Sequence, residues 1–179
     1  MQTILEETAS TIKTVGKAKR YIEIMDTTLR DGEQTSGVSF SALEKLTIAQ
    51  LLLTELKVDR IEIASARVSE GEFQAVKKIT EWATANGYID RVEVLTFVDG
   101  DTSVKWMLEA GAKVMNLLTK GSLNHLTHQL KKTPAQHFNE VGEMISLANS
   151  HGIECNVYLE DWSNGMRHSK DYVMAYLDF

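Results

Sequence analysis

Nine residues near the start of the chain carry side chains that could do chemistry together: Asp26-Thr27-Thr28-Leu29-Arg30-Asp31-Gly32-Glu33-Gln34. They follow a β-branched run at 21–25 that predicts a buried strand. Arg30 beside Asp31 combines a cation with a possible metal ligand at the end of that strand. Because ligands in α/β folds bind outside the carboxyl ends of the strands, this position favours catalysis or binding. The alternative is an ordinary Asp-Gly turn with a solvated Arg-Asp pair.

A second polar set occupies the last β-branched run, at 153–159 and just beyond. Asn156, Tyr158 and Glu160 share one face of the predicted strand, and the apolar residues between them share the other. Two buried polar side chains ending in a glutamate need hydrogen-bond partners or a ligand. A purely structural hydrogen-bonded layer is the alternative. Cys155 falls on the apolar face and is expected to be an inert core residue.

The elements that must position these residues alternate along the chain. Five apolar, β-branched runs lie at 21–26, 60–65, 91–97, 113–119 and 153–159. Between them, three helices have capping signals that begin at Ser41, Ser69 and Thr133. A shorter helix is predicted over 102–111, and a last one begins near Lys170 and is still running at Phe179. Strands that alternate with helices predict right-handed crossovers and a parallel sheet.

Two α/β architectures fit this alternation, an open doubly wound sheet and a (β/α)8 TIM barrel. The open sheet usually carries a glycine-rich phosphate turn after its first strand, and the sequence has none there. A barrel needs about 250 residues and eight strand–helix units. The sequence therefore predicts an incomplete barrel over 21–179, with five of eight units and a fifth helix that is cut off. Residues 1–20 are expected to form a separate N-terminal arm.

The composition is that of an ordinary globular protein, with 179 residues, 43% hydrophobic residues and a net charge of −6. A net negative charge without a basic run argues against nucleic acid and anionic membranes as main partners. No stretch approaches the roughly 18 apolar residues of a membrane span. A single cysteine indicates a reducing compartment, and the acidic N-terminus lacks an apolar signal core, so a cytoplasmic location is expected.

The segment from Asp26 to Gln34 resembles the signature of the DRE-TIM metallolyase superfamily, which includes 2-isopropylmalate, homocitrate and citramalate synthases and 3-hydroxy-3-methylglutaryl-CoA lyase. The resemblance extends to the end of the chain through Asp59–Ala64, Asn116–Lys120 and Tyr158–Asp161. The amino-acid sequences of Phe97–Gly100 and Tyr158–Gly165 most resemble those of citramalate synthases and their 2-isopropylmalate synthase-like relatives.

This resemblance implies an acyltransferase of leucine or isoleucine biosynthesis that condenses acetyl-CoA with a small 2-keto acid, pyruvate or 2-oxoisovalerate. It further implies a divalent metal (Mg, Mn or Zn) and a homodimer in the full-length form. By resemblance, Asp31 would be a metal ligand, and Arg30 would bind the substrate and polarise its keto oxygen. Gln34 and Glu33 would shape the same pocket, and Glu160 would act in acid/base chemistry at acetyl-CoA.

Substrate choice is expected to depend on an apolar pocket. Strand alternation predicts that Leu95 and Leu118 project inward near the strand ends, where with Tyr158 they would favour pyruvate over a dicarboxylate. The alternative for both leucines is ordinary core.

The sequence departs from the family pattern because it contains no His-x-His pair, so Asp31 is the one expected protein ligand of the metal. This leaves open a homocitrate synthase or lyase-type enzyme, or an inactive barrel fragment that acts only through association.

Lys120 and Arg167 are expected in loops after the fourth and fifth strands, on the presumed active face. Either could meet a coenzyme A phosphate, and the more common alternative is a solvent-facing cation. His125 and His128 are three residues apart, which is one metal-ligand spacing, and the alternative expected for them is a structural or solvated role. His137, His151 and His168 are isolated and are expected on the surface.

Overall fold

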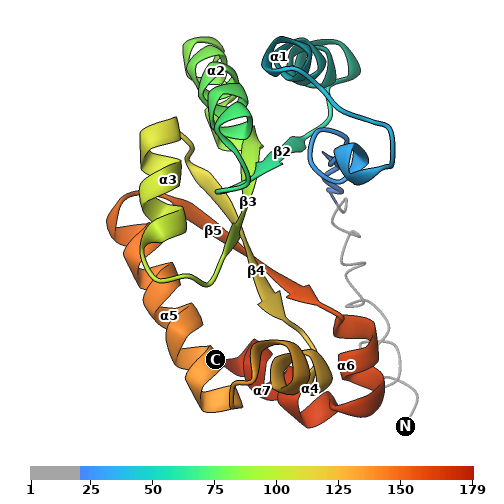
Figure 1. Cartoon of the computed structure of the whole chain (residues 1–179), viewed down its shortest axis with the longest axis vertical. Helices are drawn as coiled ribbons and strands as arrows, with labels where there is room; N and C mark the ends of the chain where they lie inside the picture. The colour runs from blue at the N-terminus through green and yellow to red at the C-terminus, as the bar shows by residue number, and fades with distance from the viewer. Residues whose placement is uncertain (1–20) are drawn as a thin grey trace, which may run out of the picture.

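The computed structural model describes residues 21–179, whose five strands form one parallel sheet in chain order. The strands are β1 Met25–Asp26, β2 Arg60–Ser65, β3 Val92–Phe97, β4 Val114–Lys120 and β5 Glu154–Glu160. Figure 1 shows the helices in an arc around them, from α1 (Ala42–Leu51) at the top to α7 (Lys170–Asp178) at the bottom. Sequential parallel strands with helices outside confirm the predicted incomplete (β/α)8 barrel. The arm expected at 1–20 lies outside the described residues.

The first strand is shorter than predicted. The prediction covered 21–26, but only two residues pair with β2, and Tyr21 and Ile22 are each 78% exposed. β1 is the edge strand of the described sheet, and the Asp59 side chain replaces part of its backbone hydrogen bonding to β2. The Asp59 carboxylate accepts hydrogen bonds from the backbone N–H of Ile24 (2.8 Å) and from Tyr21 Oη (2.7 Å).

The remaining helices follow the predicted order, with two short additions. The longer ones are α2 Glu70–Asn86, α3 Thr102–Ala110 and α5 Pro134–Ser150. The additions are α4 Leu123–His125, which continues into a π-helical turn η4 at Leu126–Leu130, and α6 Trp162–His168. A π-helical turn η2, Leu52–Leu56, extends α1, and 3-10 turns occupy Gly32–Gln34 (η1) and Ile89–Arg91 (η3). None of the helices within 21–179 has the length and apolar character required to cross a bilayer.

Two of the three predicted capping boxes form in full. Ser41 with Glu44 begins α1, and Thr133 with Gln136 begins α5, whose first residue is the predicted proline. The box predicted at Ser69 forms only in part. Ser69 accepts a hydrogen bond from the backbone N–H of Glu72, but the Glu72 carboxylate turns instead to Lys45. The contact between Glu72 and Lys45 links α2 to α1.

The hydrophobic core lies between the outer face of the sheet and the helices. Alternate strand residues such as Ile61, Ile63 and Leu117 are fully buried there. Trp82 and Trp106 pack against this core. Burial alone raises the pKa of Cys155 to about 11, which matches the inert thiol expected on this face. The inner face of the sheet differs, because its central layer carries the polar side chains of Glu62, Asn116 and Asn156.

Candidate active site

Arg30 and Asp31, the central residues of the opening motif Asp26–Gln34, contact each other directly after β1. The chain turns where Arg30, Asp31 and Gly32 each donate a backbone hydrogen bond to the carbonyl of Thr27. In this turn Arg30 Nη1 lies 2.7 Å from Asp31 Oδ1. The Arg30 side chain is 15% exposed, whereas that of Asp31 is 59% exposed. The turn therefore presents the carboxylate outward and holds the guanidinium closer to the sheet.

A buried glutamate on β2 holds Arg30 in this position. Arg30 Nε donates to Glu62 Oε2 at 2.5 Å, and Glu62 is fully buried. Its other oxygen accepts from Asn116 Nδ2 at 2.8 Å. Asn116 and Glu93 both bind the amide of Asn156 at 3.2 Å, so the polar face predicted for the last strand joins this network. Buried charges persist where they are paired and hydrogen-bonded, and here the pairing fixes the guanidinium.

A buried lysine anchors the same turn from the outside. Lys45 on α1 is 1% exposed, and its ammonium contacts Glu33 and Glu72, each at 2.6 Å, and the carbonyl of Leu29 at 3.1 Å. Burial raises the pKa of Glu33, but hydrogen bonds from Lys45 and from the backbone of Phe40 lower it by more. The pKa of Glu33 is therefore below its ordinary value. These contacts fix the turn on both sides of Arg30.

A small pocket lies beside this anchored turn. Its volume is about 360 Å³, and Arg30, Glu33 and Gln34 all line it. Three of the four residues that the resemblance grouped together thus line one pocket, and Asp31 does not line it. Gln34 is exposed, whereas the Glu33 carboxylate forms an ion pair with Lys45.

The predicted acid/base residue lies at the end of β5, in register with the end of β4. Glu160 forms an ion pair with Lys120, and the two side chains are 40% and 13% exposed. The expectation of a loop position for Lys120 is wrong, because Lys120 is the last residue of β4. Arg167 lies in α6 rather than in a loop, and it is exposed.

The backbone of Lys120 is held from both sides. Its N–H donates to His137 Nε2 at 3.3 Å, and its carbonyl accepts from Tyr172 Oη at 2.6 Å. The expectation of a surface position for His137 is wrong, since it is fully buried beneath the end of β4. Burial is the main cause that lowers the pKa of His137, which suits its role as a neutral acceptor.

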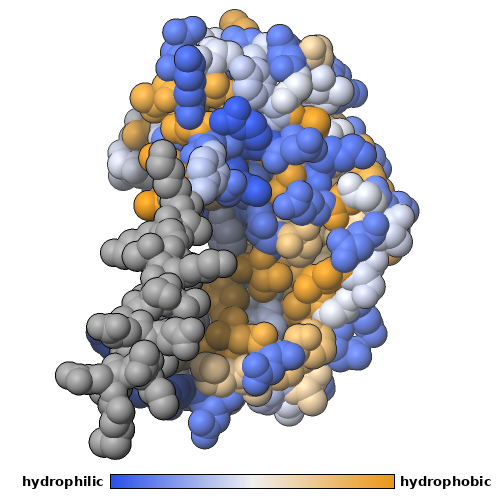
Figure 2. All heavy atoms as spheres, turned by 180° about the vertical axis from the view of Figure 1, so that it is seen from behind, coloured by the Kyte–Doolittle hydropathy of each residue, from blue (hydrophilic) through white to orange (hydrophobic). Residues whose placement is uncertain are grey.

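Apolar side chains occupy the layer just below Glu160. Phe97, Leu118 and Tyr158 are in register on β3, β4 and β5. Leu95 is in register with Asn116, one layer deeper, so it does not share the layer of the other two predicted residues. Burial, followed by the charge of Glu62, raises the pKa of Tyr158 to about 12. Figure 2 shows the molecule hollowed when seen from behind, with hydrophobic residues in the lower part of the hollow.

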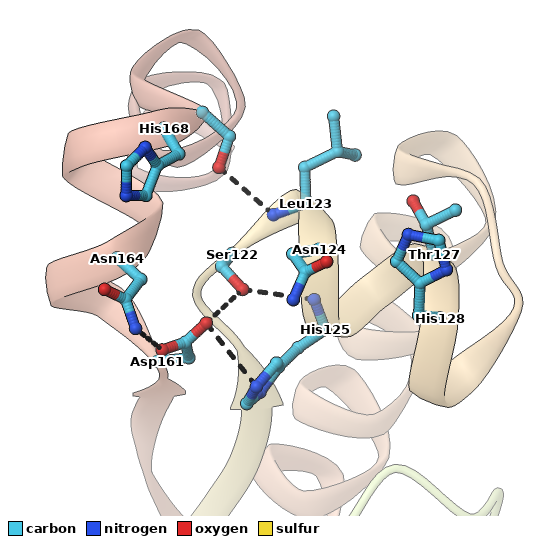
Figure 3. Close-up of a pocket in the computed structure, with 10 residues that line it drawn as sticks. Ser122, Leu123, Asn124, His125, Thr127, His128, Asp161, Asn164 and His168 are labelled. Atoms are coloured by element: carbon cyan, nitrogen blue, oxygen red, sulfur yellow. Dashed lines mark hydrogen bonds and ion pairs between the residues drawn. The ribbon is translucent and has the colours of Figure 1, made fainter.

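A larger cavity of about 590 Å³ opens beside the ends of β4 and β5. Figure 3 shows its walls, with Asn164 and His168 on α6 facing the segment from Leu123 to His128. Asp161 lies at its base and accepts hydrogen bonds from Ser122 Oγ (2.7 Å) and Asn164 Nδ2 (2.6 Å), which together lower the pKa of the carboxyl group. His125 Nε2 lies 3.5 Å from the same carboxylate, so His125 is held in place and not merely solvated.

The donor set does not amount to a metal centre by itself. Within 21–179 there is no group of three or more His, Cys, Asp or Glu side chains arranged to hold a metal ion. Asp31 offers one exposed carboxylate, and a single carboxylate competes poorly with water for a divalent cation.

Several of these residues were not identified as functional from the sequence. Glu62, Lys45, Lys120 and His125 lie within or beside the site through contacts between distant positions. A signal was present for Glu62, because a glutamate between two isoleucines in a strand must find a partner on the inner face. No comparable pattern marked Lys45, which lies on a helix among ordinary polar residues.

Comparisons with known proteins place this geometry in context. A family model described as HMGL-like matches residues 21–174. The chain is 34% identical over 156 residues to the 2-isopropylmalate synthase of Sulfurisphaera tokodaii, which covers 87% of this chain and 38% of that protein. It is 35% identical over 141 residues to the (R)-citramalate synthase CimA of Methanocaldococcus jannaschii, covering 78% of this chain and 27% of that one. The chain thus spans well under half the length of these relatives.

Proposed function

This chain belongs to the HMGL-like family, and we propose that it is an acetyl-CoA-dependent 2-keto acid synthase whose substrate is pyruvate or 2-oxoisovalerate. The main structural support is the placement of two ion-paired groups of side chains at one end of the sheet. Arg30 with Asp31 and Glu62 follows β1, and Lys120 with Glu160 ends β4 and β5. The carboxyl ends of parallel strands are where barrel enzymes bind substrates.

At the 2-keto acid, Arg30 would stabilise the charge that develops on the keto oxygen. A guanidinium has five N–H donors, more than its contacts to Glu62 and Asp31 use. Because Glu62 is buried and fixed by Asn116, the guanidinium needs little reorganisation when the charge appears. We propose Asp31 as one ligand of a divalent cation, on the strength of its exposed carboxylate at the strand end.

At acetyl-CoA, Glu160 would act as the base. Its carboxylate would take a proton from the methyl carbon as the electron pair moves onto the thioester oxygen. The enolate carbon would then attack the keto carbon of the second substrate, and water would hydrolyse the thioester with release of coenzyme A. Lys120 would hold the carboxylate in position before the proton transfer.

The apolar layer below Glu160 supports a small, apolar 2-keto acid side chain. We propose that Leu118 and Tyr158, together with the neighbouring Phe97, contact that side chain. Leu95, one layer deeper, would form the floor under this pocket. Leu118→Ala should raise the preference for 2-oxoisovalerate over pyruvate, because truncation enlarges the pocket. An unchanged ratio of kcat/KM values would contradict the assignment of Leu118.

The proposal is tested by release of free coenzyme A thiol from acetyl-CoA. Purified chain is assayed with Mg, Mn or Zn and with pyruvate, 2-oxoisovalerate or 2-oxoglutarate in parallel. We expect release that depends on pyruvate or 2-oxoisovalerate. Release that depends on 2-oxoglutarate alone would favour a homocitrate synthase, and no release with any keto acid would contradict synthase activity in this chain.

A further inference from the structure

Two side chains from helices outside the sheet hold the backbone of Lys120, the residue that pairs with Glu160. His137 lies on α5 and Tyr172 lies on α7, and both are buried. We propose that His137 and Tyr172 are positioning residues, which orient the Lys120 ammonium toward the Glu160 carboxylate. The inference rests on the function proposed above, because Glu160 is the base of that reaction. It gives a part in the chemistry to two side chains that lie behind the sheet.

The Lys120 N–H needs an acceptor because β3 ends before it. The Gly121 N–H donates to the Glu160 carbonyl, so the N–H of the preceding residue, Lys120, points the opposite way, toward β3. Phe97, the last residue of β3, is in register with Leu118, two residues short of Lys120. His137 Nε2 therefore accepts this hydrogen bond, at 3.3 Å, in place of a strand carbonyl.

The His137 ring is held in the state that can accept. Because Nε2 accepts, the neutral ring carries its proton on Nδ1. Nδ1 is buried and has no hydrogen-bond partner within residues 21–179. Burial is the main cause that lowers the pKa of His137, so the neutral ring is favoured. A second proton would remove the acceptor and leave a charge in the core.

The carbonyl of Lys120 is fixed from the other helix. Tyr172 Oη donates to it at 2.6 Å, and the Tyr172 ring stacks on Phe138 of α5 at a centroid distance of 5.8 Å. With its N–H and its carbonyl both held, the Lys120 backbone gives the side chain a fixed starting direction. A long lysine side chain loses rotamer entropy when it holds a carboxylate, and a fixed backbone reduces the number of rotamers that must be excluded. The Lys120 side chain is 13% exposed and forms its ion pair with Glu160.

α7 provides a matched pair of tyrosines for the test. Tyr172 and Tyr176 are one helical turn apart, are 7% and 6% exposed, and both stack on Phe138. Figure 1 shows α5 and α7 close together near the C-terminus. The Tyr176 hydroxyl has no hydrogen-bond partner within the described part of the chain, whereas that of Tyr172 binds Lys120. Removal of each hydroxyl leaves the same ring stacking, but only one removal frees Lys120.

The inference is tested by NMR of the intact chain. The nuclear Overhauser contact between the side chains of Lys120 and Glu160 reports the ion pair, and hydrogen exchange reports the Lys120 amide. We expect Tyr172→Phe and His137→Leu to weaken the side-chain contact, and His137→Leu to speed exchange of the amide at least about fivefold, the equivalent of one ordinary hydrogen bond. Tyr176→Phe should leave both unchanged. His137→Gln, whose Oε1 can accept in place of Nε2, should restore both.

Thiol release is measured on the same variants. Because a misplaced base slows the proton transfer and leaves substrate binding intact, we expect kcat to fall at least about fivefold in Tyr172→Phe and His137→Leu. The KM for acetyl-CoA should stay unchanged in both, and kcat should be retained in Tyr176→Phe and His137→Gln.

The inference is overturned if Tyr172→Phe and Tyr176→Phe have equal effects, if His137→Gln does not restore the contact, or if the unaltered chain shows no contact between Lys120 and Glu160. Thiol release reports the proposed function separately. The expected NMR changes in a chain that releases no thiol would support the assignment of His137 and Tyr172 and contradict synthase activity in this chain. Release that is unaffected by either substitution would do the reverse.

Discussion

At the scale of single residues, the position of Arg30 depends on Glu62, a carboxylate 32 positions away in the chain. The opening motif supplies a guanidinium, but a guanidinium on a turn has many accessible rotamers. The buried carboxylate of Glu62 on β2, which is itself fixed by Asn116, holds the Arg30 side chain in one of these rotamers. The charge–charge contact thus serves orientation, a role in which the rigid fork of arginine is more effective than a lysine.

Removal of this carboxylate should be costly. Glu62→Ala removes the buried partner of Arg30 and leaves only the exposed carboxylate of Asp31, and we predict a loss of about 3–5 kcal/mol in the free energy of unfolding. Urea denaturation measures the change. Glu81→Ala, an exposed position on α2, is the control and should stay within about 0.5 kcal/mol. A small effect at Glu62 would mean that Arg30 finds another partner.

The sequence was informative about residues whose partners are neighbours in the chain. Arg30 with Asp31, and the alternation of Asn156 with Tyr158, follow from spacing of one and two residues. The sequence does not reveal that Lys45 is buried, because its two carboxylate partners come from a turn and from another helix. His137 was misjudged for the same reason, since its partner is the backbone of a distant strand.

At the scale of elements, α6 packs closely against the loop that follows β4. A Cβ atom on Gly165 would overlap the carbonyl oxygen of Gly121, which is backbone and cannot move aside easily. This close contact brings α6 against the segment from Gly121 to Leu123 and so forms one wall of the cavity beside Glu160.

A glycine-to-alanine pair tests this packing. Gly165→Ala should destabilise the protein by about 1–3 kcal/mol, because the extra methyl group overpacks the contact. Gly71→Ala, in the first turn of α2 where a Cβ meets only Ser69 Oγ at 3.7 Å, should stabilise it by about 0.5–1 kcal/mol. Thermal unfolding of both variants measures the difference. Equal effects would contradict the close approach of α6.

The tie between the first turn, α1 and α2 should be visible in the pH dependence of stability. The pKa of Glu33 is below its ordinary value of 4.5, so its pairing stabilises the fold above that pH. The stabilisation is lost as the pH falls from 4.5 through the lower folded-state pKa. Lys45→Met should destabilise the protein at pH 7 by about 3–5 kcal/mol and flatten this acid transition. Lys78→Met, which is exposed on α2, serves as control; an unchanged acid slope in Lys45→Met would contradict the account.

Most elements could be predicted because their periodic patterns are long. β2 to β5, α1, α2, α3, α5 and α7 all occur where alternation and capping signals indicated. The short elements could not be found in this way. α6 includes Asn164-Gly165, a pair that usually marks a turn, and α4 is a single turn before η4. β1 was overextended because apolar residues at a sheet edge resemble those of a buried strand.

At the scale of the whole molecule, the chain forms five units of a fold that is closed by eight. It spans 27 to 38% of the length of the two relatives described above. The inner face of this partial barrel is polar at its centre, with the Glu62–Asn116–Asn156 layer, and apolar above it, with Phe97, Leu118 and Tyr158. The homodimer and the cytoplasmic location expected from the sequence stay predictions.

The measurement that tests the central claim most directly compares two glutamates at opposite ends of β5. Glu160→Gln and Glu154→Gln make the same change on one strand, at its carboxyl and amino ends. Keto-acid-dependent release of coenzyme A thiol should fall at least about 100-fold in Glu160→Gln, as expected for loss of a general base, and remain unchanged in Glu154→Gln. Equal rates in the two variants would contradict a role for Glu160 and for this end of the sheet.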